Sequence, residues 1–106
     1  MHLLVVVVHD EEALDEVLTV LVEHELLHSV VVEARTGLEL LERDLPIFAG
    51  LRALVPGGID FCRLVLCPVP SALGETVLAD LERVHLDPGD RPGFALLLEP
   101  GPMVRV

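Results

Sequence analysis

The sequence predicts an α+β fold in which a four-stranded antiparallel sheet carries two helices on one face. Apolar, β-branched runs alternate with segments of helical periodicity in the order strand–helix–strand, and this order occurs twice. The 106 residues suit one domain, which we place over residues 1–106. The chain is 52% hydrophobic with only three Phe and no Trp or Tyr, so Val and Leu supply most of the expected core.

The first half begins with an apolar run over residues 3–8, which is typical of a buried strand. Asp10 can cap the helix that follows, and Glu11 and Glu12 suit the positive N-terminal end of that helix. The apolar side chains of this helix recur at helical spacing: Leu14, Val17, Leu18 and Leu21. Residues 29–34 form the second expected strand.

The second half repeats this arrangement. A strand over residues 63–69 is followed by a helix that Pro70 and Ser71 open, by a loop over residues 85–93 and by a last strand over residues 94–99. The inward positions of the two helices correspond in sequence: Val17, Leu18 and Leu21 match Val77, Leu78 and Leu81. Two strand–helix–strand units of this length predict a ferredoxin-like βαβ–βαβ fold with a long, partly helical insert between the halves.

The insert covers residues 35–60 and combines turn residues with apolar ones. We expect two short helices, around residues 38–42 and 48–54, because Pro46 separates them and a Pro-Gly-Gly sequence ends the second. An ordered loop of this length is uncommon unless it has a function. Its apolar residues either pack within an oligomer or dock on a partner, and Phe48, Leu51 and Arg52 are the expected partner contacts.

The expected strands are apolar at successive positions, as in residues 3–8, 30–32, 64–67 and 94–98. A strand with one face in water should instead alternate between apolar and polar residues. Two helices cover one face of the sheet, and the chain has no further residues assigned to the other. We therefore expect an obligate oligomer in which the sheets of different subunits face each other.

The charge of the chain excludes some classes of ligand. The net charge is −11 and all seven cations are Arg, so we expect no nucleic-acid binding. Residues 1–34 hold eight acids and no Arg, which places any anion site in the later part of the chain.

The N-terminal apolar run is short and lacks a basic segment before it, so we expect no membrane insertion. Cys62 and Cys67 are five apart, which points them to opposite faces of a strand and indicates reduced, buried thiols in a cytoplasmic protein.

Three stretches in this order give the chain a family resemblance: "ARTG" before the insert, "DLPIFAGLRAL" within it, and "PGDRPGFALLLEP" at the last strand. With them the chain resembles the PII-like signalling proteins, divergent relatives of the nitrogen regulatory protein P-II. The resemblance implies a homotrimer with the sheets around a central axis, and it implies that residues 36–58 correspond to the T-loop that contacts targets. It also implies an adenine nucleotide (ATP, ADP or AMP) as effector in clefts between subunits, no obligatory cofactor, and a transporter or metabolic enzyme as target.

The usual P-II pattern before the last strand is Gly-Asp-Gly-Lys-hydrophobic-Phe. Here Gly89, Asp90 and Phe94 match it, whereas the phosphate-binding lysine falls on Pro92. An Arg can supply the missing cation, because a guanidinium matches phosphate geometry. The nucleotide-binding residues that the resemblance implies are Arg35 and Gly37 at the loop base, Gly89, Asp90 and Arg91 before the last strand, and Arg105 near the C-terminus.

The chain also departs from the standard nitrogen sensors. It has no Gln, so it lacks the glutamine that helps to hold 2-oxoglutarate, and it has no Tyr that could be uridylylated. No residues form a catalytic set: we expect Ser71 to cap a helix, and no base lies near Cys67. We therefore expect no enzyme, and the resemblance implies a regulatory protein.

Three alternatives stay open. Residues 85–93 can be a plain helix-to-strand turn, since Pro, Gly and Asp are ordinary turn residues. His24 and His28 are four apart, as in a metal-binding trimer similar to the CutA proteins, although we favour surface histidines near a helix end and assign no metal ligand. The third alternative is a module that binds an amino acid, as ACT domains do.

Overall fold

The computed structural model describes residues 1–44, 61–84 and 93–106. The elements, in chain order, are β1 (His2–Val8), α1 (Glu11–Glu23), β2 (Val30–Glu33), α2 (Gly37–Asp44), β3 (Arg63–Val69), the 3-10 turn η3 (Ser71–Leu73), α3 (Gly74–Glu82) and β4 (Phe94–Leu98). The four expected strands and the two expected packing helices are all present, and α2 contains the first helix expected in the insert. The second helix expected there, over residues 48–54, lies outside the described residues.

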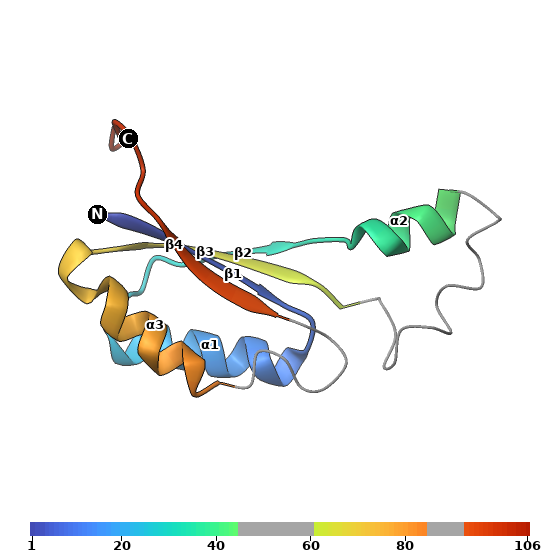
Figure 1. The fold of residues 1–106 in the computed structure, drawn as a ribbon, viewed down its shortest axis with the longest axis horizontal. Coiled ribbons are helices and arrows are strands. Elements are labelled where there is room, and N and C mark those ends of the chain that lie inside the picture. Colours follow the sequence, from blue (N-terminus) through green and yellow to red (C-terminus); the bar gives the residue numbers. More distant parts are fainter. Residues whose placement is uncertain (45–60, 85–92) are drawn as a thin grey trace.

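The four strands form one sheet in the order β2-β3-β1-β4, and every pair of neighbours is antiparallel. Both α1 and α3 lie on the same face of this sheet, whereas α2 lies beyond the end of β2 and away from the other helices (Figure 1). The prediction of an α+β chain with a four-stranded antiparallel sheet is therefore confirmed.

Helix α1 begins where the sequence predicts. The Asp10 carboxylate Oδ1 accepts a hydrogen bond from the Glu12 backbone N–H at 2.9 Å, which satisfies one of the amides that a helix start leaves without a partner. Glu11 and Glu12 occupy the first turn, where negative charge interacts favourably with the helix dipole. The strand-to-helix connection is thus fixed by its own local residues.

The C-terminal end of α1 is an αL turn without glycine. The backbone N–H groups of Glu25 and Leu26 donate to the carbonyls of Val22 and Leu21, each at 2.9 Å, in the Schellman pattern. Glu25 has a φ of 60°, a conformation that favours glycine. This turn sends the chain from α1 towards β2.

The core lies between the sheet and the helices α1 and α3. Alternate side chains of β1 and β3 point into it, and one stripe of each helix faces them. Ten of its side chains are less than 2% exposed: Leu4, Val6, Val8, Val17, Leu21, Val65, Cys67, Val69, Val77 and Leu81. No buried residue of the described parts is polar or charged, so apolar burial and backbone pairing hold these layers together.

The other face of the sheet, which we call the open face, is also apolar. The strand register places its residues in transverse rows across the sheet. They are Leu3, Val5 and Val7 of β1, Val30 and Val32 of β2, Leu64 and Leu66 of β3, and Phe94, Leu96 and Leu98 of β4. Val30, Phe94 and Leu98 are 55%, 51% and 47% exposed.

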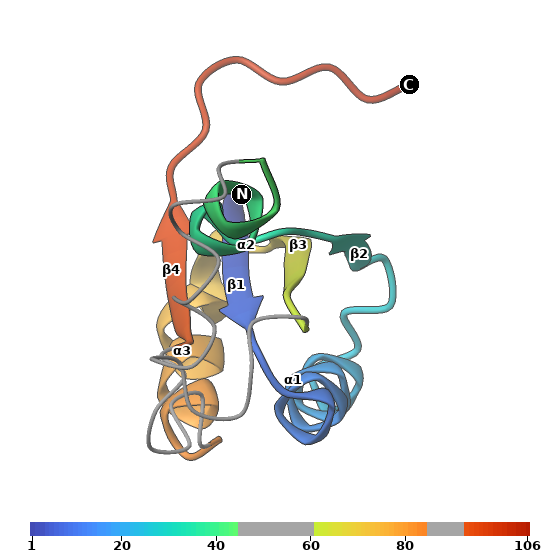
Figure 2. The same ribbon diagram turned by 90° about the vertical axis from the view of Figure 1, so that its right-hand side faces the viewer.

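None of the described elements covers the open face. Helices α1 and α3 lie on the opposite side of the sheet, α2 lies beyond the end of β2, and the C-terminal residues leave β4 and rise away from the sheet (Figures 1 and 2). In this C-terminal segment Met103, Val104 and Val106 are themselves exposed. The absence of polar alternation in the strands thus corresponds to an apolar surface that the described chain leaves in contact with solvent.

Candidate functional site at the base of the insert

One end of the sheet gathers the two connections that the sequence singled out. Glu33 at the end of β2 pairs with Arg63 at the start of β3, which pairs with Val8 at the end of β1, and Phe94 pairs with Val7. The insert leaves from β2 at this end, and the loop over residues 85–92 joins β4 at the same end. The fold therefore attaches both predicted ligand-binding segments to one end of the sheet, which we call the loop end.

A polar cavity of about 360 Å³ lies at the loop end beside β2. The described residues that line it are Glu33, Ala34, Arg35, Glu39 and Arg63. Two guanidinium groups and two carboxylates thus face one small volume. A cavity with both charges suits a polar ligand that carries an anionic group, or one that carries both charges.

Arg63 is held in place by three contacts. Its Nη1 donates to the Cys62 carbonyl at 3.0 Å, its Nη2 donates to Glu33 Oε1 at 3.4 Å, and its guanidinium carbon lies 4.3 Å from the centre of the Phe61 ring. The pair with Glu33 crosses from β3 to β2, where opposite charges favour the pairing of the strands. Sequence reasoning missed Arg63 as a site residue, although its place at the start of a strand that follows the insert was visible.

Local capping fixes the start of α2, directly after Arg35. Thr36 is the residue before α2, and its Oγ1 accepts a hydrogen bond from the Glu39 backbone N–H at 3.1 Å, while its carbonyl accepts from Leu40 N at 3.2 Å. The sequence Thr-x-x-Glu at this point is the pattern of a capping box. Gly37 starts α2 with no atom within 4 Å of the place where a Cβ would lie, so close packing does not require a glycine there.

Two charged groups in this cavity have atoms without a polar partner among the described residues. Arg35 is exposed, and its guanidinium makes no hydrogen bond or ion pair with any residue of the described parts. Glu39 Oε2 is buried and accepts no hydrogen bond. A buried acceptor without a donor is unfavourable unless a ligand or solvent supplies one. The Arg35 guanidinium thus lines the cavity at the base of the insert without a partner among the described residues, and its role in binding an anion stays a prediction.

Arg105 lies at the opposite end of the sheet. It lines a separate cavity of about 390 Å³ together with Met1, His28, Pro68 and Met103, among others. Leu98, at the end of β4, pairs with Leu3 near the start of β1, which is the end remote from Arg35. One chain therefore does not bring Arg35 and Arg105 together, although the sequence analysis assigned both to one kind of site.

Several predicted site residues lie outside the described residues. These are Gly89, Asp90 and Arg91 of the expected nucleotide set and Phe48, Leu51 and Arg52 of the expected partner contacts. Phe94, which follows the first of these segments, is described and belongs to the open face.

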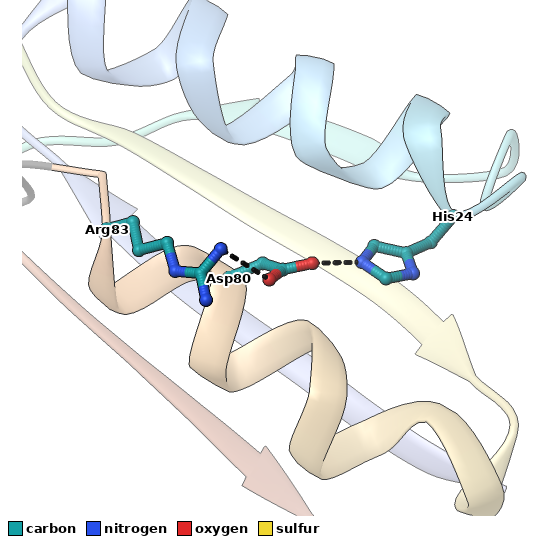
Figure 3. Close-up of polar contacts among 3 residues, drawn as sticks. All are labelled: His24, Asp80 and Arg83. Carbon is teal, nitrogen blue, oxygen red and sulfur yellow. Dashed lines mark hydrogen bonds and ion pairs between the residues drawn. The ribbon is translucent and has the colours of Figure 1, made fainter.

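The helix side of the molecule carries a different, acidic groove. A groove of about 640 Å³ lies between α1 and α3. Five acidic residues line it: Glu12, Asp15, Glu16, Glu23 and Asp80. Among the described lining residues, Arg83 is the one Arg. Next to it, His24 Nε2 lies 2.6 Å from Asp80 Oδ2, and Arg83 Nη1 lies 3.8 Å from Asp80 Oδ1 (Figure 3). The contact ties the end of α1 to α3. A groove of this charge does not suit a nucleotide.

The histidine pair considered as a metal site is not aligned on a helix. Helix α1 ends at Glu23, His24 points to Asp80, and His28 lines the cavity that contains Arg105. Across the described ranges, no three His, Cys, Asp or Glu side chains are grouped so that they could hold a metal ion.

Both cysteines are free and buried. Burial raises the pKa of the Cys67 thiol, and burial, partly opposed by the charge of Arg63, also raises the pKa of the Cys62 thiol. The interpretation of the two cysteines as small buried side chains is confirmed.

Ser71 does not cap α3 as expected. Its Oγ accepts a hydrogen bond from the Met1 nitrogen at 2.8 Å, and α3 starts at Gly74 without a side-chain cap. The side chain instead links the connection after β3 to the start of β1.

Comparison with known proteins gives no family assignment. No protein-family model matches the chain, and no curated protein matches its sequence. In the described parts of the chain, no helix has the length and apolar character that crossing a membrane requires.

Proposed function

We propose that this chain is a non-enzymatic, cytoplasmic, PII-like regulatory protein that works as a homotrimer. A small effector, an adenine nucleotide, binds between subunits and controls a partner protein through the loop over residues 36–58. The fold under this proposal is ferredoxin-like. The strand order β2-β3-β1-β4 and the position of α1 and α3 on one face support that assignment.

The observation that carries the proposal is the open face. It is apolar on all four strands, and its most exposed side chains are about half accessible. Full burial of such a side chain contributes about 1.5–3 kcal/mol, so covering a half-exposed one contributes about 1 kcal/mol. Three subunits whose open faces point to a common axis would cover this surface with copies of itself.

The loop end supports a ligand site at the base of the insert. Arg35 presents there a guanidinium that makes no hydrogen bond or ion pair with the described residues, and the segment that contains Arg91 joins the sheet at the same end. Arg105 lines a cavity at the other end of the sheet in its own chain, so the proposed site at the loop end is built from Arg35 and the segment that contains Arg91. A site shared between subunits links effector binding to assembly.

The position of Arg35 gives the effector a route to the loop. Arg35 directly precedes Thr36, whose side chain starts α2, and α2 is the described beginning of residues 36–58. A ligand shifts a conformational equilibrium only if it binds one conformation better than the other. A phosphate on Arg35 would favour the α2 orientation that keeps Arg35 in the cavity. The loop would then present its apolar residues to a target, a transporter or a metabolic enzyme.

Native mass spectrometry of the full chain, alone and with ATP, ADP or AMP, tests the proposal. We expect a trimer that takes up as many as three nucleotides, and we expect Arg35→Ala to reduce the uptake. Arg83→Ala is the matched control, because it removes an exposed arginine from the acidic groove far from the loop end. A monomer would contradict the trimer, and a trimer without nucleotide uptake would contradict the choice of effector.

One observation favours a second candidate, an ACT-like module that binds an amino acid. The cavity at the loop end holds Arg35 and Arg63 together with Glu33 and Glu39, which matches a ligand with both a carboxylate and an ammonium group. This candidate predicts that free amino acids bind in the same experiment, that nucleotides do not, and that Glu39→Gln weakens the binding.

A further inference from the structure

We propose that the free edge of β2 pairs with the free edge of β4 in the next copy, so that the sheets of the oligomer join into a closed ring with the open faces inside. This inference rests on the proposed homotrimer. It adds the surface through which the copies join, which the burial of the open face alone does not specify.

The exposure of β2 on both faces is the first reason. All four residues of β2 are exposed. Val30 and Val32 belong to the open face, but Val31 pairs with Val65 of the core and points to the helix side, where it is still 42% exposed. Packing of one open face against another would cover Val30 and Val32 and leave Val31 in water. A neighbour beside β2, rather than above it, covers both sides of the strand.

The two edges of the sheet are the second reason. Within the described residues, β2 and β4 each have a neighbouring strand on one side only. Soluble proteins usually protect such edges with charged residues, prolines or bulges. Residues 30–32 are all Val, and β4 reads FALLL without a charge or a proline. The one charge of β2, Glu33, lies at the end of the strand and pairs with Arg63, so residues 30–32 and the whole of β4 carry none of these protections, as expected if another strand covers each edge.

The strand directions allow the two edges to pair. Successive neighbours across the sheet are antiparallel, so β2 runs in the direction of β1 and β4 runs in the opposite direction. When copies are related by rotation about one axis, β2 of one copy therefore meets β4 of the next in antiparallel orientation. The alternation continues without interruption around a closed ring, because each copy contributes an even number of strands.

A symmetric pair of β2 strands is the competing arrangement, and it leaves more surface uncovered. Two β2 strands related by a two-fold axis would form one wider open sheet. Both open faces would then lie on the same side of that sheet, still in contact with water, and both β4 edges would stay free. A ring curves the sheets around the open faces and covers both edges.

The size of the open face also favours contacts beyond it. With strands about 4.8 Å apart and a rise of about 3.3 Å per residue, four strands of about five residues cover roughly 300 Å² in projection. A standard stable interface buries about 800 Å² on each partner. Pairing along both edges supplies additional contact area and satisfies backbone groups that are otherwise left to solvent.

The rows of the sheet predict the register. Val30 lies in the same transverse row as Leu96, and Val32 lies in the same row as Phe94. If these rows continue across the junction, Val31 faces Ala95 of the next copy on the helix side. Ala95 is only partly buried against the core, and its small side chain leaves room for Val31. Val31 and Ala95 are therefore the pair to test.

Disulfide cross-linking of the full chain tests this register. In the double variant Val31→Cys/Ala95→Cys, mild oxidation should join subunits into covalent dimers and trimers, because directly opposed residues of antiparallel strands lie within disulfide range. Each single variant should stay monomeric on a non-reducing gel, since its new cysteine faces an unchanged Val or Ala. The native cysteines remain, because both are buried.

The mass of the reduced double variant separates the two proposals. A trimeric mass without cross-links overturns the edge pairing and leaves the proposed trimer standing, whereas a monomeric mass overturns both. Covalent dimers from Val31→Cys alone overturn the ring in favour of the symmetric β2 pair. If the Ala95 substitution prevents folding, hydrogen exchange of the unsubstituted protein decides. The β2 amides that do not bond to β3 should exchange at least 10-fold more slowly than in a solvent-exposed edge, and unprotected amides overturn the proposal.

Discussion

The αL turn at the end of α1 predicts that one substitution raises the free energy of unfolding. Glu25 holds a φ of 60° while its backbone N–H and that of Leu26 close the helix end. We expect Glu25→Gly to stabilise the protein. Glycine adopts this conformation without the steric conflict that a Cβ causes, and the two backbone hydrogen bonds remain in place.

The size of the effect follows from two opposing terms. A side chain in the left-handed region costs about 1–2 kcal/mol. Glycine also raises the conformational entropy of the unfolded chain, which reduces this gain by about 0.4–1 kcal/mol. The net gain in the free energy of unfolding is about 0.5–1 kcal/mol. For a domain of this size that corresponds to a rise of about 2–5 °C in the melting temperature.

Thermal and urea unfolding at one fixed protein concentration measure the change, because assembly makes the melting temperature depend on concentration. Glu25→Ala is the matched control: it removes the carboxylate from the negative end of the helix but keeps the Cβ in the left-handed region. The control should gain less than glycine does. Equal gains from both variants would refute the steric reasoning in favour of charge, and no gain from glycine would refute it outright.

Three further results are expected. Asp10→Ala should lower the free energy of unfolding by about 1 kcal/mol in urea titrations, whereas Asp10→Ser should keep the cap, and equal losses would contradict the capping role. A double-mutant cycle of His24→Ala and Asp80→Ala should give a coupling of about 0.5–1.5 kcal/mol, and additive effects would show that the 2.6 Å contact contributes no stability. Burial raises the pKa of the Cys62 and Cys67 thiols, so a thiol reagent at about pH 8 should label the folded protein far more slowly than the urea-unfolded one. The labelling rate of the folded protein should keep increasing with pH beyond the ordinary cysteine pKa, where that of an exposed thiol levels off, and fast labelling at about pH 8 would contradict the burial.

The strands and the start of α1 could be predicted from local sequence, because the residue types there strongly favour one kind of secondary structure. The Val-rich run of β1 cannot form a stable surface helix, and Asp10 marks the start of α1 by a contact two residues away. The open face could also be predicted, since the lack of polar alternation in β4 is a property of five consecutive residues. These features depend on neighbours in sequence.

The candidate site was only partly predictable because it depends on contacts between distant residues. Arg63 was missed, since its pair with Glu33 arises from the β2–β3 register across the insert, which no local pattern determines. Arg35 and Arg105 were grouped from a resemblance in order along the chain. The register of β1 with β4 places them at opposite ends of the sheet. Because β2 and β4 run in opposite directions in this sheet, the residues that follow the two strands lie at opposite ends of it.

The central place of β1 affects how the chain can fold. β1 precedes β3 and β4 in the chain, yet it pairs with both. During synthesis its apolar residues therefore lack one or both neighbouring strands until β4 has been made, about 90 residues later. Pairings this distant in sequence make folding slow, because long loops must close before the contacts form. A nascent chain that exposes such a segment is prone to aggregate, so we expect the unfinished chain to depend on chaperones more than the finished one does.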